Sequence, residues 1–171
     1  GQPERALKLF DEIGQSLETG NTHSNEALFR HSYAVSLFTA GHAEKASEQL
    51  ARAVELTPQF LDLFWRAGLS EADRTLPDEA AQKVIQQRLL QTLEATAARL
   101  PNNPAVLQNI GRHHQYTLNH EAALKAFQRA MQIAKQTSKP ETFLTADFFF
   151  DLGSVYERLQ NLEEAERYLQ R

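Results

Sequence analysis

The chain has 171 residues, of which 42% are apolar, and its 22 acidic and 18 basic side chains leave a net charge of −4. This charge argues against a surface for nucleic acid or anionic lipid, and the absence of cysteine excludes disulfides and thiolate metal sites. No apolar run approaches the roughly 18 residues of a membrane span, so we expect no transmembrane helix. The first residues show no signal-peptide pattern, and the composition leaves the cellular compartment open.

The first element is expected to be one helix without its partner. In residues 1–22, Ala6, Phe10 and Ile13 recur at helical spacing and share one face. This is the pattern of the second helix of a pair whose first helix is missing. Two interpretations follow: the chain is a fragment of a longer repeat protein, or its exposed terminal helices pair with another copy.

Four helical pairs are expected to follow, each closed by a short polar turn. We predict these pairs at 24–58, 59–101, 102–139 and 140–171. In each, a small residue is followed twelve positions later by alanine: Ala34 and Ala46, Gly68 and Ala80, Gly111 and Ala123, Gly153 and Ala165. A glycine inside a helix costs about 1 kcal/mol relative to alanine, so its recurrence indicates that another backbone passes close by.

The pairs differ in length. Alanines of successive second helices lie 40, 34, 43 and 42 residues apart, which indicates lengthened helices. Between positions 77 and 100, an apolar stripe at helical spacing predicts about six turns of helix. The polar run from Lys135 to Thr145 predicts a loop, with a new helix beginning near Pro140.

The segments FFDLGSVYERLQNLEEAERYL, from Phe149 to Leu169, and LQNIGRHHQYTLNHEAALKAFQRA, from Leu107 to Ala130, carry the pattern most clearly. In these positions the chain resembles the tetratricopeptide repeat family, whose units are helix-turn-helix hairpins. The resemblance covers almost the whole chain and implies one all-α domain over residues 1–171. It also implies a right-handed superhelical stack with a concave groove lined by the first helix of each pair.

The resemblance further implies which side chains line that groove. The residues that it selects are Leu28, His31, Val35, Phe38, Asp62, Trp65, Leu69, Gln108, Arg112, Tyr116, Asp147, Phe150, Ser154 and Arg158. The paired lysines and asparagines with which some family members hold a terminal carboxylate are missing from this surface. Aromatic side chains and arginine instead predict the binding of an apolar or amphipathic protein segment.

Several assignments have alternatives. A one-residue change of register would place Trp65 in the core and Phe64 outside. Phe150 is similarly ambiguous because it follows two further phenylalanines, and Arg112 is either a ligand contact or an ordinary solvated arginine. Asn109 and Asp151 are alternative polar contacts to a bound peptide.

Catalytic and metal-binding motifs are not apparent, so we expect no enzymatic activity, no metal and no cofactor. His113 and His114 are adjacent on a helix and diverge by about 100°, so they do not easily share one metal ion. We expect His114 to be a packed core residue. Asp147 and Asp151 share a face, and without a base beside them we expect binding or solubility roles.

The sequence is therefore consistent with three functions. The first is a protein-interaction scaffold that binds a peptide or partner protein in its groove. The second is self-association through the terminal helices, and the third is RNA binding, which the net charge and the groove acids disfavour.

Overall fold

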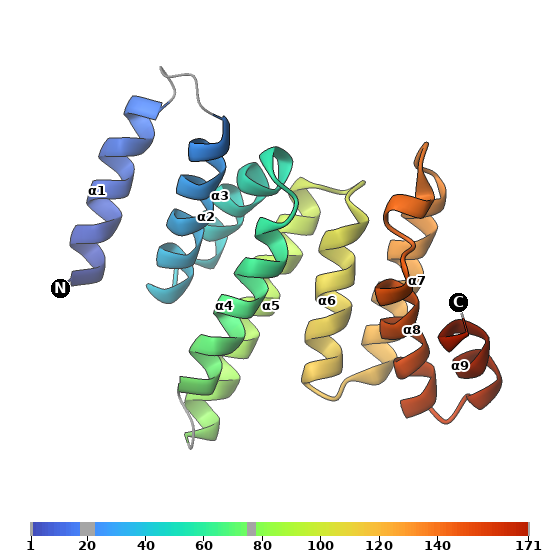
Figure 1. Ribbon diagram of the computed structural model, residues 1–171. Coiled ribbons are helices and arrows are strands. Elements are labelled where there is room, and N and C mark those ends of the chain that lie inside the picture. The colour runs from blue at the N-terminus through green and yellow to red at the C-terminus, as the bar shows by residue number, and fades with distance from the viewer. Residues whose placement is uncertain (1, 18–22, 75–77, 171) are drawn as a thin grey trace. The chain divides into compact units, whose positions relative to one another are not determined.

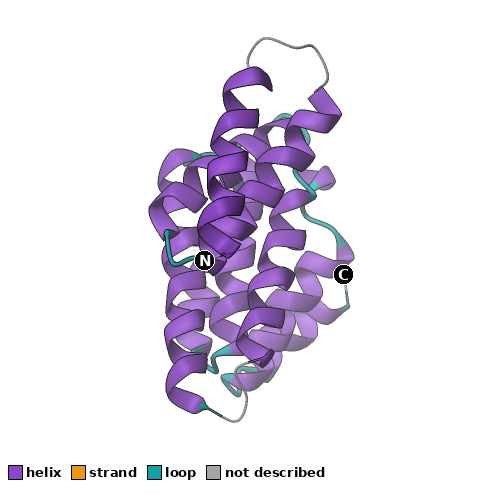
Figure 2. Cartoon of the chain, turned by 90° about the vertical axis from the view of Figure 1, so that its left-hand side faces the viewer, coloured by secondary structure: helices purple, strands orange, loops and turns teal. Residues whose placement is uncertain are grey.

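The computed structural model describes residues 2–17, 23–74 and 78–170, and within them the regular structure is helical (Figures 1 and 2). The chain divides into two compact units, Gly1–Arg99 and Leu100–Arg171. Unit 1 contains α1 (Gln2–Leu17), α2 (His23–Thr39), α3 (Ala43–Leu56), α4 (Phe60–Arg74) and α5 (Glu79–Arg99). Unit 2 contains α6 (Pro104–Tyr116), α7 (His120–Lys135), a 3₁₀ turn (Pro140–Thr142), α8 (Ala146–Arg158) and α9 (Leu162–Leu169). The fold class is all-α, as the sequence predicts.

Three of the helical pairs close with the same turn. Gly41, Leu118 and Gln160 have φ angles of 92°, 61° and 59°, in the left-handed region. In each turn the next residue donates its backbone N–H to a carbonyl five positions earlier, at 2.8 to 2.9 Å. These bonds satisfy carbonyls that the ends of α2, α6 and α8 would otherwise leave unpaired. Asn119 and Asn161 then cap the second helices, because their side chains accept hydrogen bonds from the first turns of α7 and α9.

In unit 1, α2 packs against α1, α3 and α4, and α5 packs against α3 and α4. The ring of Phe10 on α1 stacks on Tyr33 of α2 with centroids 5.0 Å apart, and the Tyr33 hydroxyl donates to Asp11. Burial, followed by this hydrogen bond, raises the pKa of Tyr33 to about 12. The prediction of a helix in residues 1–22 agrees with α1, although positions 18–22 lie outside the described residues.

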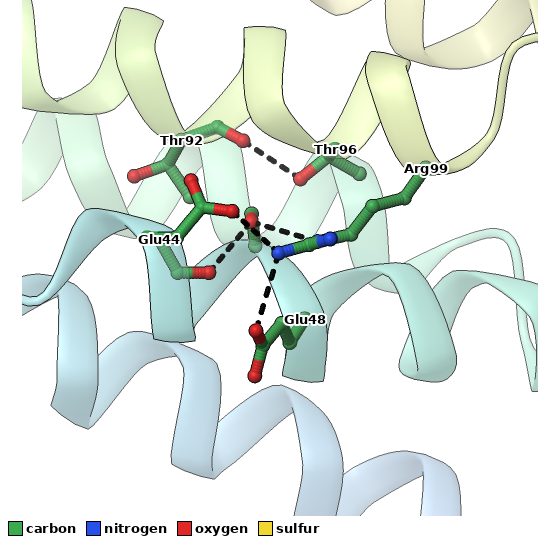
Figure 3. A network of polar contacts seen from close by, with 6 residues as sticks. Glu44, Glu48, Thr92, Thr96 and Arg99 are labelled. Carbon is green, nitrogen blue, oxygen red and sulfur yellow. Dashed lines mark hydrogen bonds and ion pairs between the residues drawn. The ribbon is translucent and has the colours of Figure 1, made fainter.

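The interface between α3 and α5 contains a polar network (Figure 3). Arg99 Nε donates to the buried Ser47 hydroxyl at 3.1 Å, and Arg99 Nη2 lies 2.5 Å from Glu44 and 3.2 Å from Glu48. The buried Thr96 hydroxyl donates to a carbonyl of its own helix at 2.7 Å. The network therefore ties the end of the long α5 to the start of α3 without leaving these buried hydroxyls unsatisfied.

Unit 2 has a core of aromatic and aliphatic side chains from α7, α8 and α9. Phe127 and Phe148 are fully buried, and their rings meet edge to face with centroids 6.1 Å apart. Leu152 and Val155 of α8 and Tyr168 of α9 complete this core. Both helical pairs of the unit thus bury one common apolar cluster.

The helical glycines lie where the second helix of each pair approaches most closely. A Cβ atom at Gly68, Gly111 or Gly153 would lie 2.7 Å from a side-chain atom of Leu89, Phe127 or Leu169, respectively. The close approach expected from the sequence is present. The nearest atom at each of these glycines belongs to a side chain, however, and at Gly153 the backbone nitrogen of Leu169 also lies 3.3 Å away.

The two insertions are accommodated differently. Residues Glu79–Arg99 form the 21-residue helix α5, which confirms the predicted lengthened helix; position 77 lies outside the described residues. The prediction of a new helix near Pro140 is wrong, because that proline begins only a short 3₁₀ turn and α8 starts at Ala146. Thr145, with extended backbone, precedes α8 and ends the loop.

Candidate partner-binding surface

The predicted groove residues are divided between the two units, seven in unit 1 and seven in unit 2. In both, these residues lie on the first helices of the pairs, α2 and α4 in unit 1 and α6 and α8 in unit 2.

In unit 2, a polar network joins the facing helices α6 and α8. Asp151 Oδ2 accepts hydrogen bonds from Gln108 Nε2 at 2.8 Å and from Arg112 Nε at 2.7 Å. Gln115 Nε2 lies 3.4 Å from the Asp151 carbonyl oxygen. The structure therefore brings two predicted site residues, Gln108 and Arg112, onto one carboxylate.

The ion pair at the centre of this network is partly buried. The side chain of Arg112 is 24% exposed and that of Asp151 is 16% exposed. A charge-assisted pair in such a setting is stronger than a fully solvated one, because less water competes for its hydrogen bonds. Arg112 is thus held in place by a partner, which neither of its two sequence interpretations includes.

Exposed aromatic side chains accompany the network on both helices. Tyr116 lies one turn beyond Arg112 on α6 and is exposed, and Phe150 precedes Asp151 on α8 and is 63% exposed. Of the three consecutive phenylalanines, Phe148 is the buried one. The remaining predicted residues of α8 are the exposed Asp147 and Arg158 and the half-buried Ser154.

In unit 1, the predicted residues are more buried. His31 is half-buried and its ring stacks on Phe60 of α4, with centroids 4.8 Å apart. Burial lowers the pKa of His31 below its usual value. Val35 and Leu69 are also half-buried, whereas Leu28 is exposed.

Two aromatic assignments in unit 1 are decided by burial. Phe38, expected in the groove, is instead buried and packs edge to face on Phe64, with centroids 5.6 Å apart. It belongs to the core because α2 turns that side toward α4. Of the pair Phe64 and Trp65, Phe64 is the core residue and Trp65 is half-buried. The Trp65 indole nitrogen is buried and lacks a hydrogen-bond partner among the described residues.

The adjacent histidines of α6 differ from the prediction. The buried one is His113, whereas His114 is only half-buried, so the expectation of His114 in the core is corrected. Burial, and to a smaller extent the neighbouring His114, lower the pKa of His113 to about 4. His113 is therefore a neutral core residue at physiological pH.

Asp151 is the residue that sequence reasoning underrated. Its spacing of four from Asp147 marked a shared face, and it stood only as an alternative to the main set. Its pairing with Arg112 depends on how α6 and α8 face each other, which periodicity within one helix does not reveal.

Among residues 2–17, 23–74 and 78–170, no three His, Cys, Asp or Glu side chains are grouped as metal ligands. Among the same residues, every helix is too short or too polar to cross a membrane.

Comparison with known proteins finds a repeat-family match in unit 2. Residues 103–171 match the family model described as tetratricopeptide repeat. A 52-residue part of the chain, 30% of its length, is 38% identical to the response regulator aspartate phosphatase E of Bacillus subtilis (strain 168). The match spans only 14% of that relative.

Solved structures extend the likeness to both units. The structure of MamA 41-end from Desulfovibrio magneticus RS-1 has a TM-score of 0.51, with 99% of this chain and 83% of that chain covered. A crystal structure of MamA also has a TM-score of 0.51, with 98% and 85% covered. Both are 16% identical to this chain, so the likeness shows the fold alone.

Proposed function

We propose, from the premise that residues 103–171 belong to the tetratricopeptide repeat family, that this interaction scaffold binds an amphipathic protein segment on the α6–α8 face of unit 2. A scaffold for protein interaction is the general function of such repeats. The segment and the face that binds it are the specific part of the proposal. By the α6–α8 face we mean Gln108, Arg112, Tyr116, Phe150 and Asp151.

The observation that carries the proposal is the combination of a fixed polar centre with exposed rings. The bonds from Arg112 and Gln108 to Asp151 hold three side chains in one arrangement before a partner arrives. Binding then costs less side-chain entropy, which is about 0.5 to 1.5 kcal/mol for each long side chain that must be immobilised. Tyr116 and Phe150 supply the apolar area that dominates interface energetics. Such a surface suits a segment with apolar side chains on one side and polar groups on the other.

We also infer that unit 2 acts on this face by binding and not by catalysis. A general base needs a carboxylate that is available to accept a proton from the substrate. Asp151, the carboxylate at the centre, already accepts two hydrogen bonds from neighbouring side chains. Its role is therefore to orient Gln108 and Arg112.

Site-specific photocrosslinking tests the proposal. The photoreactive residue p-benzoylphenylalanine replaces Phe150 in the 171-residue chain, which is then irradiated in a lysate of the organism that encodes it. A control chain carries the same residue in place of Leu162, which is 68% exposed against 63% for Phe150. We expect a crosslinked protein that is obtained from position 150 and not from position 162.

The sequence of the crosslinked peptide decides between outcomes. An amphipathic crosslinked segment that competes for binding as a synthetic peptide supports the proposal. That peptide should also bind Phe150→Ala at least about tenfold more weakly than Leu162→Ala. Crosslinks of equal yield from both positions, or a synthetic peptide that binds both variants equally, would contradict it.

A second candidate function is self-association through the terminal helices. Leu9 and Ile13 of α1 are exposed, as is Leu169 of α9. Exposed apolar side chains of this kind favour contact between copies, and contact between different ends of the molecule would form an open chain. Sedimentation velocity over a hundredfold range of concentration tests this candidate. A constant monomer mass would exclude it, and a rise that Leu9→Ser and Leu169→Ser each remove would support it.

A further inference from the structure

Unit 2 carries a cleft on a different helix, α7. It has a volume of about 630 Å³ and is lined by α7 and by the turn at 101–102. A smaller hollow of about 340 Å³ shares Asn102, Ile133 and Gln136 with it and extends the lining to Thr137. Volumes of this size lie within the range of about 300 to 1,000 Å³ that is usual for ligand sites. None of the residues of the α6–α8 face lines this cleft.

The cleft is positively charged, although the whole chain is acidic. Lys125 and Arg129 line it, and no acidic residue does. Both cations are exposed, and neither forms an ion pair within the described residues. They are four positions apart, so they lie on one face of α7, about 6 Å apart along its axis.

Amide side chains continue the same face. Gln128, Gln132 and Gln136 follow each other at intervals of four and line the cleft beside the two cations. Gln128 is already oriented, because its Nε2 atom donates to the Tyr156 hydroxyl at 3.2 Å. Glutamine amides can both donate to and accept from the backbone of an extended peptide. Ile133 supplies an apolar part of the lining.

We propose that this cleft binds an extended acidic protein segment, with carboxylates at alternate positions facing Lys125 and Arg129. Side chains two residues apart in an extended chain point the same way and are separated by about 6.6 Å. This distance nearly equals the rise between the two cations on α7. The cleft thus fits an acid-x-acid pattern, in which the glutamine row bonds the backbone and the cations bond the carboxylates. It would be a second partner site, independent of the one proposed on the α6–α8 face.

The lining favours a protein segment over RNA. Recognition of single-stranded RNA relies on aromatic or arginine surfaces on which bases stack, and on several phosphate contacts. This cleft has no aromatic lining residue, only two cations, and belongs to a chain of net charge −4. Carboxylates on a peptide need only the two positive charges that are present.

Fluorescence anisotropy with a defined probe tests the proposal. The probe is a fluorescein-labelled octapeptide of alternating aspartate and serine, and the reference peptide has asparagine in place of aspartate. The 171-residue chain is compared with the double variant Lys125→Gln, Arg129→Gln and with the charge-matched control Lys135→Gln, Lys139→Gln. The control cations are exposed and do not line the cleft, and glutamine is compatible with a helix at every helical position changed.

We expect the acidic peptide to bind the wild-type chain and the Lys135, Lys139 control with equal affinity, and the cleft variant about tenfold more weakly. The reference peptide should bind all three chains as weakly as the cleft variant binds the acidic one. Far-UV circular dichroism confirms that the variants remain helical. Equal weakening by both double variants would overturn the proposal, because the effect would then be one of net charge. Equal binding to all three chains, or tighter binding of a labelled oligouridine than of the acidic peptide, would also overturn it.

Discussion

Replacing His113 by leucine should remove a large part of the pH dependence of stability. The His113 side chain is 2% exposed in α6, and its Nδ1 atom has no hydrogen-bond partner among the described residues. A charged imidazole in this position would be desolvated, and a positive His114 beside it would add repulsion. The folded protein therefore keeps His113 neutral until the pH is near 4.

The sign and size of the effect follow from proton linkage. The pKa of His113 falls from 6.5 in the unfolded chain to about 4 in the folded protein. Between these values the unfolded state binds a proton that the folded state does not, so acid favours unfolding. The free energy of unfolding should fall by about 1.4 kcal/mol for each pH unit, or about 3 kcal/mol between pH 6.5 and pH 4. Above pH 6.5 this contribution to stability is fully present.

Urea unfolding followed by circular dichroism from pH 4.5 to 7.5 measures this change. The stability of the wild type relative to His113→Leu should decline as the pH falls through that range. The control is Val106→Ala, which truncates another fully buried side chain of α6 and should change stability by an amount independent of pH. If the difference in the free energy of unfolding between the wild type and His113→Leu does not change from pH 4.5 to 7.5, the reasoning is refuted. An NMR titration of the imidazole should independently place the His113 midpoint near 4.

Three further predictions concern packing, a turn and the α6–α8 face. Gly111→Ala should lower stability by about 1 to 2 kcal/mol, because its Cβ would lie 2.7 Å from the Phe127 ring, and the loss should shrink in a Phe127→Leu background. Purely additive effects in urea unfolding would contradict that contact. Leu118→Gly should raise the free energy of unfolding by about 0.5 kcal/mol, because the exposed Leu118 has a φ of 61° that glycine adopts without strain. A lower melting temperature would argue against it. Asp151→Asn should lower the free energy of unfolding by about 1 kcal/mol at low salt. A double-mutant cycle with Arg112→Gln should show a coupling energy that decreases in 1 M salt. A coupling energy of zero at low salt would show that the ion pair does not stabilise the fold.

Much of the fold could be predicted from sequence because it depends on local patterns. The spacing of small residues and alanines places the faces of the hairpins, and the stripe between positions 77 and 100 predicts α5. The turns were predictable from their polar residues, but only Gly41 indicated a left-handed backbone there. Leu118 and Gln160 adopt the same conformation because the hairpin imposes it, and their side chains carry no signal of it.

The candidate site was less predictable, because neighbouring positions on one helix differ in burial. Phe150 was assigned to the groove with its burial left ambiguous, and its exposure depends on which face α8 turns toward α7 and α9. The same holds for His113 and His114, where the buried member was misidentified. The groove as a whole, the superhelical stack and the single-domain organisation stay predictions.

By itself, the sequence determined that this is an all-α chain of helical pairs, with their approximate limits, one lengthened helix and small residues at the close contacts. Helical periodicity and turn chemistry act over a few residues, so they can be read along the chain. Only the tertiary structure decided that Asp151 holds Gln108 and Arg112 and that α7 carries a cleft without acidic lining residues. These features arise between elements tens of residues apart, where helix rotation and distance select the partners, and no repeat spacing encodes that choice.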